Sequence, residues 1–486
     1  MTSEPPPRAG TSAFFALVWT AVFYALVLAA VVGLAWLASE GITGGAAMER
    51  KWVGLCVVGI GLVLFACLPR RARFVAPGPA LVAAEHPALA VLLDAVARET
   101  GQAAPTSYWS PEAKLAPESV GGFLGLGGRR VLTLGFPVVT GLDADALKAA
   151  LAGEFARSSP TDGAWTARVG RMRDAVRRAA APENSASPPP LFVRLLHAPF
   201  AGFAQFFLEV SAPVGRRQRA LAEAAASRIA GADAVARARV ERPRFEIAWL
   251  EYLETAVEPV LLAKRRPPLA AGWRTYLASP EICAALARRE ERSLRRAAGT
   301  PDAATRVVAS PPSTMAGLVL GDLDALELEL LDAVAGSKSI RAHAPITWDR
   351  LVPELLEPQW RDALARYAEG LRGLVAEAIP ARPEDLTELG RRLNPKDAKD
   401  PVGAQGRATL VLSAALAVSL RRAGFGLDSR PGAPLRAQRG SDVVDIDDVI
   451  RDVAAGRLTP AAWGERCRAL GIAGLDLGAE AQAFLG

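Results

Sequence analysis

The stretch from Ala13 to Leu37 most limits how this chain can fold, because its 25 residues include no charged side chain. As an α-helix that rises about 1.5 Å per residue, it would be about 37 Å long. Such a helix can cross the hydrocarbon core of a bilayer with some tilt. The apolar region of a secretory signal peptide is only about half as long. The stretch therefore predicts a transmembrane helix.

A second apolar segment, Val53 to Leu68, has 16 residues and flanking side chains that can anchor its ends at the membrane surface. Together the two segments predict a transmembrane helical hairpin, joined by the loop from Ser39 to Trp52. More basic residues follow the second segment than lie in the loop. They are Arg70, Arg71 and Arg73 after the segment, and Arg50 and Lys51 in the loop. By the positive-inside rule we expect an integral protein of the inner or plasma membrane, with its globular part in the cytoplasm.

The composition favours helices and a membrane partner. Hydrophobic residues make up 51% of the chain, aromatic residues only 6%, and the mean hydropathy is +0.18. Abundant alanine and arginine favour helices over strands. The net charge of +6 suits an anionic membrane surface or a nucleic acid. Since the sequence has no basic patch with interleaved aromatics, we expect the lipid bilayer as a partner and no nucleic acid.

The hydrophobic periodicity after residue 76 predicts a mainly α fold with a small β-hairpin or sheet. Two strand patterns, Thr106 to Trp109 and Val131 to Val139, lie on either side of a Gly-rich turn. Asp143 is expected to cap a helix that runs through Phe155. The apolar segment Leu191 to Val214 is interrupted by charges, which predicts a helix at the membrane interface. Further helices are expected at Arg216 to Ala230, Phe245 to Ala263 and Pro280 to Ala298, in a region up to about residue 424, and near Asp447 and Thr459, with a hairpin at Arg436 to Val444.

The order of these elements resembles a known family. A two-span hairpin, a helix, a β-hairpin, the strand Leu132-Thr133-Leu134-Gly135 and a helix ending Ala-Leu-Ala-Gly-Glu-Phe-Ala-Arg are similar to the integral-membrane zinc metallopeptidases of the HtpX and CAAX prenyl protease type. Three later features extend the likeness, which covers roughly residues 13 to 315. They are Asp162, where the family often has Gly-Gly-Asp; Arg216-Arg217-Gln218 with the small-residue helix up to Gly231-Ala232, similar to its second zinc helix; and Ser310-Pro311-Pro312, similar to its His-Pro-Pro segment.

This resemblance implies a zincin-like metallopeptidase core. We expect it at residues 76–318, between an N-terminal tail with two transmembrane helices (1–75) and a helical C-terminal region (319–486). In the family, a His-Glu-x-x-His helix supplies two zinc ligands and a general base, and a Glu from a later helix supplies the third ligand.

The zinc ligands of the family are absent here. The five residues that match its first zinc helix are Gly153, Glu154, Phe155, Ala156 and Arg157. Of these, only Glu154 keeps the family's residue, at the position of the general base. Arg219 stands where the third ligand is expected, Glu223 where an Asp follows, and Ser310 where a His would be.

The histidine count argues against zinc without any alignment. The chain has three histidines, His86, His197 and His343, which are 111 and 146 residues apart. A zinc site needs three or four converging ligands, and no cysteine pair with ligand spacing compensates. The sequence also lacks a GxSxG nucleophile motif. We therefore predict no metal, no other cofactor and no catalytic residue.

Two alternatives remain for the charged residues at the degenerate site. Glu154 with Arg157, and Arg219 with Glu223, have the spacing of ion pairs along one helix. If the two helices face each other as in the family, all four side chains could form one buried network in which guanidinium–carboxylate pairing replaces the metal. Otherwise they form two ordinary exposed pairs.

Three functions are compatible with the sequence. The first is a membrane-anchored pseudoprotease that binds or regulates other membrane proteins or a protease. The second is an active zinc metalloendopeptidase whose site is non-standard or completed by a partner. The third is a scaffold that acts through its C-terminal region.

Overall fold

The computed structural model describes residues 9–43, 53–62, 75–120, 129–157, 168–170, 172–173, 176–177, 191–297, 320–321, 323–335, 338–380, 382–394 and 400–486. These residues are mainly helical, with few strands. The chain divides into two compact units, Met1–Pro243 with Thr314–Asp322, and Arg244–Ser313 with Leu323–Gly486. This division by packing differs from the domain boundaries expected at residues 75 and 318, which stay predictions.

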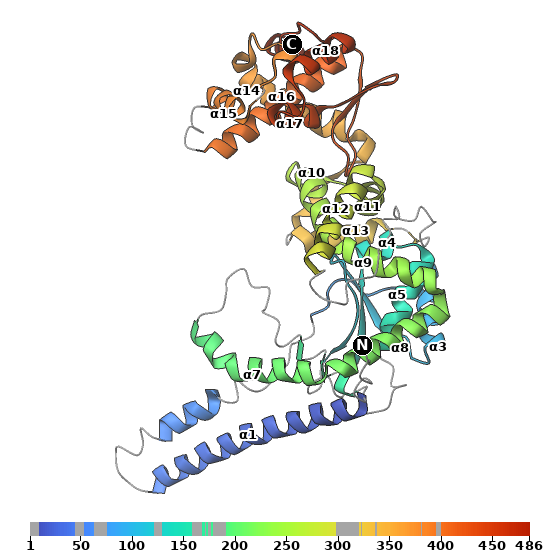
Figure 1. The fold of residues 1–486 in the computed structure, drawn as a ribbon, viewed down its shortest axis with the longest axis vertical. Coiled ribbons are helices and arrows are strands. Elements are labelled where there is room, and N and C mark those ends of the chain that lie inside the picture. Colours follow the sequence, from blue (N-terminus) through green and yellow to red (C-terminus); the bar gives the residue numbers. More distant parts are fainter. Residues whose placement is uncertain are drawn as a thin grey trace, which may run out of the picture. The chain divides into compact units, whose positions relative to one another are not determined.

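The first unit begins with a long apolar helix, α1 (Ala9–Thr43) (Figure 1). The helix Val53–Leu62 packs against it, since a methyl group added at Gly59 would lie 3.4 Å from Leu34 Cδ1. Within Thr11–Glu40, the mean hydropathy over an 18-residue stretch reaches 2.5, and only 11% of that stretch is buried inside the protein. Length and composition thus suit α1 for crossing a membrane, as predicted. The expected loop and residues 63–68 lie outside the described residues.

A small mixed sheet follows. Its strands are β1 (Thr106–Ser110), β2 (Leu115–Val120) and β3 (Arg129–Gly135), in the order β1-β3-β2. Strand β1 is parallel to β3, and β2 is antiparallel to it. The strand expected to reach residue 139 ends at Gly135 instead, because Pro137 lies in the first turn of α4 (Phe136–Gly141) and proline favours that position in a helix.

Helices surround this sheet. They are α3 (Pro87–Glu99), α5 (Ala144–Arg157), α7 (Leu191–Val210), α8 (Ala212–Ala230) and α9 (Ala232–Tyr252). The predicted cap of α5 is confirmed, since Asp143 Oδ1 accepts a hydrogen bond from the Ala146 N–H at 2.8 Å. The segment expected as one helix from residue 191 to 214 is divided at Ser211.

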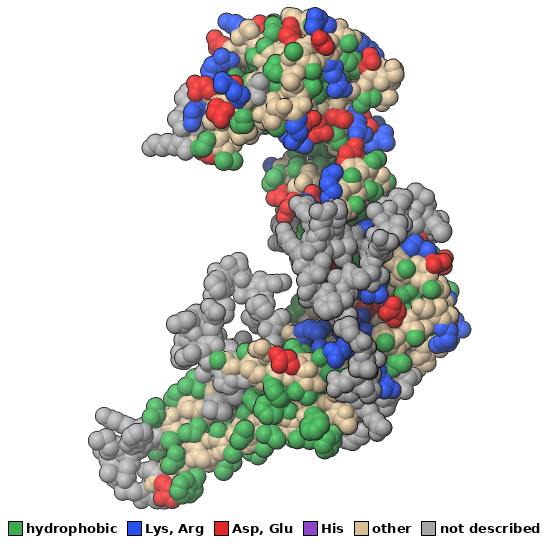
Figure 2. Space-filling view, viewed as in Figure 1, with side chains coloured by type: hydrophobic (Ala, Val, Ile, Leu, Met, Phe, Trp, Pro, Cys, Tyr) green, Lys and Arg blue, Asp and Glu red, His purple; other side chains and the backbone are tan. Residues whose placement is uncertain are grey.

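Helix α7 packs against the first half of α1. The rings of Trp19 and Phe206 lie 4.4 Å apart, and those of Phe23 and Phe203 lie 4.3 Å apart. Residue numbers rise along α1 while they fall along α7, so the two helices are antiparallel here. Large apolar side chains remain exposed along α1, as the green surface over this helix shows (Figure 2), and Phe206 is exposed on α7.

The second unit is almost entirely helical. Its longer helices are α11 (Leu269–Ala278), α12 (Pro280–Ala297), α13 (Asp324–Ala335), α14 (Glu357–Tyr367), α15 (Pro383–Leu393), α16 (Pro401–Arg422), α17 (Ile446–Ala454), α18 (Pro460–Leu470) and α19 (Leu477–Leu485), with α10 (Glu258–Leu262) and short 3-10 or π segments between them. The strands are β4 (Arg265–Arg266) parallel to β5 (Ala344–Pro345), and β6 (Gly426–Asp428), β7 (Arg436–Arg439) and β8 (Asp442–Asp445) in an antiparallel sheet. The hairpin predicted at Arg436 to Val444 is thereby confirmed.

Helix α16 is the centre of the C-terminal core. It is also long and apolar enough to cross a membrane, but 61% of its apolar window is buried inside the protein. A methyl group added at Gly390 would lie 1.9 Å from the Ala404 carbonyl oxygen, so α15 approaches α16 very closely. The buried Trp463 donates its indole N–H to the Ala376 carbonyl at 2.8 Å. Burial of this kind is typical of the core helix of a globular unit.

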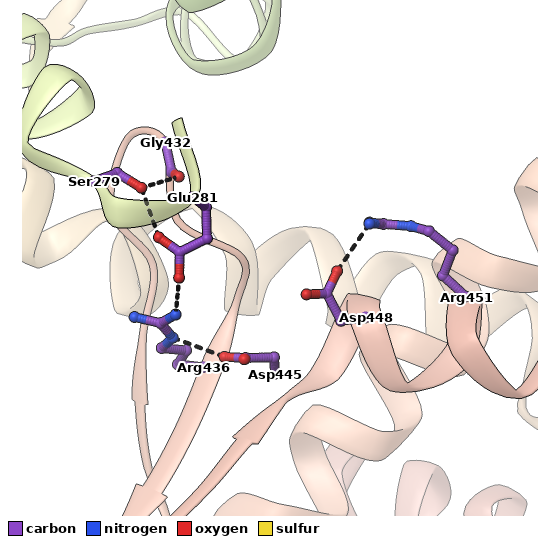
Figure 3. Close-up of polar contacts among 7 residues, drawn as sticks. All are labelled: Ser279, Glu281, Gly432, Arg436, Asp445, Asp448 and Arg451. Atoms are coloured by element: carbon purple, nitrogen blue, oxygen red, sulfur yellow. Dashed lines mark hydrogen bonds and ion pairs between the residues drawn. The ribbon is translucent and has the colours of Figure 1, made fainter. Parts of the chain in front are cut away.

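A group of polar contacts links the start of α12 to the antiparallel sheet of β6, β7 and β8 (Figure 3). The Arg436 guanidinium contacts both Glu281 and Asp445, the latter at 2.7 Å. Ser279 Oγ lies 2.7 Å from Glu281 Oε2 and 2.6 Å from the Gly432 carbonyl oxygen. The hydrogen bond from Ser279, helped by Arg436, lowers the pKa of Glu281.

Candidate functional site

Glu154, which matches the general-base position of the resembled family, is buried. Its helix, α5, consists largely of small and apolar residues that are covered on most sides. Helix α8 packs along it, with Gly153 facing Ala226 so that an added methyl group would lie 3.9 Å from the Ala226 Cβ. Glu154 is 3% exposed in this setting. A buried carboxylate is costly unless other groups compensate its charge.

Two arginines provide that compensation. Arg242 Nη1 lies 3.0 Å from Glu154 Oε1, and Arg157 Nη2 lies 3.2 Å from the same oxygen. The Arg157 side chain is 47% exposed, whereas that of Arg242 is 30% exposed. Charge-assisted hydrogen bonds of this type are stronger than neutral ones. The Arg242 contact joins α5 to α9, and the Arg157 contact stays within α5.

Arg242 also binds the sheet. Its Nη2 donates to the Leu115 carbonyl at 3.0 Å. Strand β2 is at the edge of the sheet, and the Gly135 N–H donates to the Lys114 carbonyl, so the backbone groups of Leu115 and of every second residue after it point away from β3. One guanidinium therefore connects α9, α5 and the outer edge of β2.

A second arginine of α9 binds the other end of α5. Arg237 Nε lies 3.0 Å from Asp143 Oδ2, while Asp143 Oδ1 caps the helix. Asp143 is 4% exposed. The hydrogen bond to Asp143 raises the pKa of Arg237. Helix α9 thus holds both ends of α5 through ion pairs with buried carboxylates.

Neither of the two alternatives for these four residues describes the structure, since they form neither one network nor two exposed pairs. Arg219 is exposed on α8 and donates only a long hydrogen bond, 3.4 Å, to the Gly215 carbonyl one turn earlier. Glu223 pairs instead with Arg239 at 3.3 Å, and both side chains are more than half exposed. The reason is that α8 presents the small residues Ala222 and Ala226 to its neighbours, and turns the charged positions to solvent. Only the Glu154–Arg157 pair forms as expected.

Sequence reasoning missed Arg242, which replaces the expected contribution of α8. It lies 88 residues after Glu154 in a segment with several other arginines, Arg-Val-Glu-Arg-Pro-Arg. Nothing in that pattern separates Arg242 from Arg239 or Arg244. Its role depends on how α9 is placed against α5.

The donor set around Glu154 does not fit zinc. Among the described residues, two guanidiniums contact the carboxylate, and they offer no lone pair to a metal and repel a cation. Within the described residues, no group of three or more His, Cys, Asp or Glu side chains is arranged to hold a metal ion. His86 is buried against Trp109, and burial lowers its pKa. Asp162, Ser310 and the side chain of His197 lie outside the described residues.

The chain was compared with protein-family models, with curated proteins and with solved structures. No family model matches it, and neither a curated protein nor a solved structure does.

Proposed function

We propose that this chain is a membrane-anchored pseudoprotease that binds or regulates other membrane proteins. The proposal takes α1 and the apolar segment after it as the anchor, with the globular part of the chain that follows them on the cytoplasmic side. The observation that carries it is the double ion pair of Glu154, because it occupies the one carboxylate that a metallopeptidase of the resembled type would use as its base.

The arrangement is unsuited to hydrolysis. A general base must lie within hydrogen-bond reach of the water whose proton it takes. In a zinc peptidase the metal also acidifies that water. Glu154 Oε1 instead accepts from Arg157 and Arg242, and cationic groups stand where a metal would have to approach.

Arg242 also limits access for an extended peptide. A peptide that adds to a sheet edge pairs with the outward-pointing N–H and C=O groups of the edge strand. Here the outward carbonyl of Leu115 already accepts from Arg242. Pro117, the next residue with the same orientation, has no N–H to offer. Both features support a binding role that does not depend on cleavage at this edge.

Metal analysis and a proteolysis assay on the full-length protein test the proposal. We expect that the purified protein holds no stoichiometric zinc. We also expect that it shows no chelator-sensitive cleavage of unfolded membrane-protein substrates. Glu154→Gln should leave partner binding unchanged, with Glu223→Gln on the exposed face of α8 as the matched control. Chelator-sensitive proteolysis that Glu154→Gln abolishes would establish an active metallopeptidase instead.

A scaffold role for the C-terminal region is the second candidate. It is supported by the extensive buried core of the second unit, which surrounds α16 and includes Leu364, Ile450 and Trp463. Photo-crosslinking from exposed positions in the full-length chain distinguishes the two roles. Partner crosslinks confined to α14–α19 would favour the scaffold, and crosslinks confined to the first unit would favour the pseudoprotease core.

A further inference from the structure

The exposed apolar surface of α1 meets one exposed aromatic side chain of α7. Trp19 and Phe206 are in ring contact and both remain exposed, at 36% and 44%. Because the helices are antiparallel, Phe206 lies at the same height along α1 as Trp19. Any environment that covers α1 at that height must also cover the outer side of α7.

The level at which the apolar surface ends is marked by one cluster. Val214, in the first turn of α8, is fully buried in the same apolar cluster as Ala13 and Ala16, at the start of the charge-free stretch of α1. If α1 crosses the bilayer, this cluster lies at the border of the hydrocarbon region. The residues that follow Val214 then lie at the level of the lipid headgroups.

Those residues are basic and exposed. Arg216 has no acidic partner among the described residues, and Arg219 donates only to the Gly215 carbonyl of its own helix. The exposed acid nearest to them on α7 is Glu209, which contacts Gln205 at 3.4 Å. Two guanidiniums without a carboxylate partner in the described part of the chain, beside an apolar helix face, match the chemistry of a phosphate group above an acyl chain.

We infer that Arg216 and Arg219 bind the phosphates of anionic phospholipids, while the Phe206 side of α7 lies in the membrane beside α1. The inference rests on the membrane anchoring in the proposed function and adds a lipid-headgroup site to it. It also assigns a role to Arg219, which the family resemblance placed at a zinc-ligand position.

Spin-labelled lipids added to the full-length protein in vesicles test this headgroup preference. An arginine near an anionic surface contributes about fivefold in affinity, so we expect labelled phosphatidylglycerol to be favoured over phosphatidylcholine by up to about 30-fold for the two residues together. The double variant Arg216→Gln/Arg219→Gln should lose most of this preference. Arg382→Gln/Arg430→Gln, two exposed arginines of the second unit, removes the same charge elsewhere and should keep it.

Each outcome separates the inference from the proposal beneath it. A protein that does not float with vesicles would refute the anchoring itself. A protein that floats but shows no headgroup preference, or whose preference survives Arg216→Gln/Arg219→Gln, would refute the lipid site alone. Equal loss in the control variant would reduce the effect to net charge and overturn the site as well.

A crosslinker tests the position of α7 directly. With benzoylphenylalanine in place of Phe206, crosslinks to lipid are expected. Crosslinks to a second copy of the chain in place of lipid would identify this face as a dimer interface and overturn the inference.

Discussion

Replacing Arg242 by Met should loosen α5 far more than replacing Arg157, although both arginines contact the same oxygen of Glu154. Breaking a buried ion pair from one side costs about 3–5 kcal/mol, because the remaining charge stays buried. The Arg242 side chain is 30% exposed, which places the loss near the lower end, about 3 kcal/mol. Arg157 is 47% exposed and three residues along the same helix, a setting worth about 0.2–0.5 kcal/mol.

Hydrogen exchange measured by mass spectrometry on the full-length protein reads this difference locally. At about 1.4 kcal/mol per factor of ten, Arg242→Met should speed amide exchange in α5 and β2 about 100-fold. Arg157→Met should change it about twofold or less. Adding Glu154→Gln to Arg242→Met should recover part of the loss, since the uncompensated charge is removed.

The two arginines therefore act as each other's control. If Arg242→Met and Arg157→Met had equal effects, or if Glu154→Gln failed to relieve Arg242→Met, the buried ion pair would not be what holds α5. Compensation of the Glu154 charge by Arg242 would then not be what stabilises α5.

Three further predictions concern stability, each measured as the thermal unfolding midpoint of the full-length protein. Asp143→Ala removes a helix cap and a partly buried ion pair, and should lower the free energy of unfolding by about 2 kcal/mol. Gly390→Ala should lower the free energy of unfolding by about 1–3 kcal/mol through overpacking. Gly406→Ala, where an added methyl group would have nothing within 4 Å, should leave the free energy of unfolding unchanged or raise it by up to about 1 kcal/mol. Equal effects of the two substitutions would contradict the close approach of α15 to α16. Burial lowers the folded-state pKa of His86, so the unfolded chain takes up a proton on this side chain first as the pH falls. The free energy of unfolding should therefore fall as the pH drops below about 6.5. His86→Phe should lessen that fall, and an unchanged pH dependence in this variant would refute the role of His86.

Local chemistry made several elements predictable from sequence. The charge-free run starting at Ala13 specified a long apolar helix, because a helix satisfies its own backbone groups. Asp143 marked the start of α5, since its side chain can accept from the first free N–H groups. The hairpin predicted at Arg436 to Val444 corresponds to β7 and β8. Each of these signals lies within about one helix or hairpin of the structure that it specifies.

Other features differ from what the sequence predicted. Proline at position 137 ended β3 earlier than its apolar pattern suggested, and Ser211 divided a segment that reads as one helix. The charges on α8 have the spacing of a site, yet the helix turns them to solvent because its small residues pack inward. Whether a spaced pair of charges is buried or exposed depends on the rotation of its helix against its neighbours.

The sequence by itself determined that Glu154 stands on a helix and that the metal ligands of the resembled family are missing around it. Only the tertiary structure decided what compensates its buried charge. Arg157, one turn away, was foreseeable, because i and i+3 side chains meet on any helix. Arg242 lies 88 residues further along the chain and was not foreseeable, because its contact with Glu154 depends on the packing of α9 on α5. That packing supplies the cation that a buried carboxylate needs.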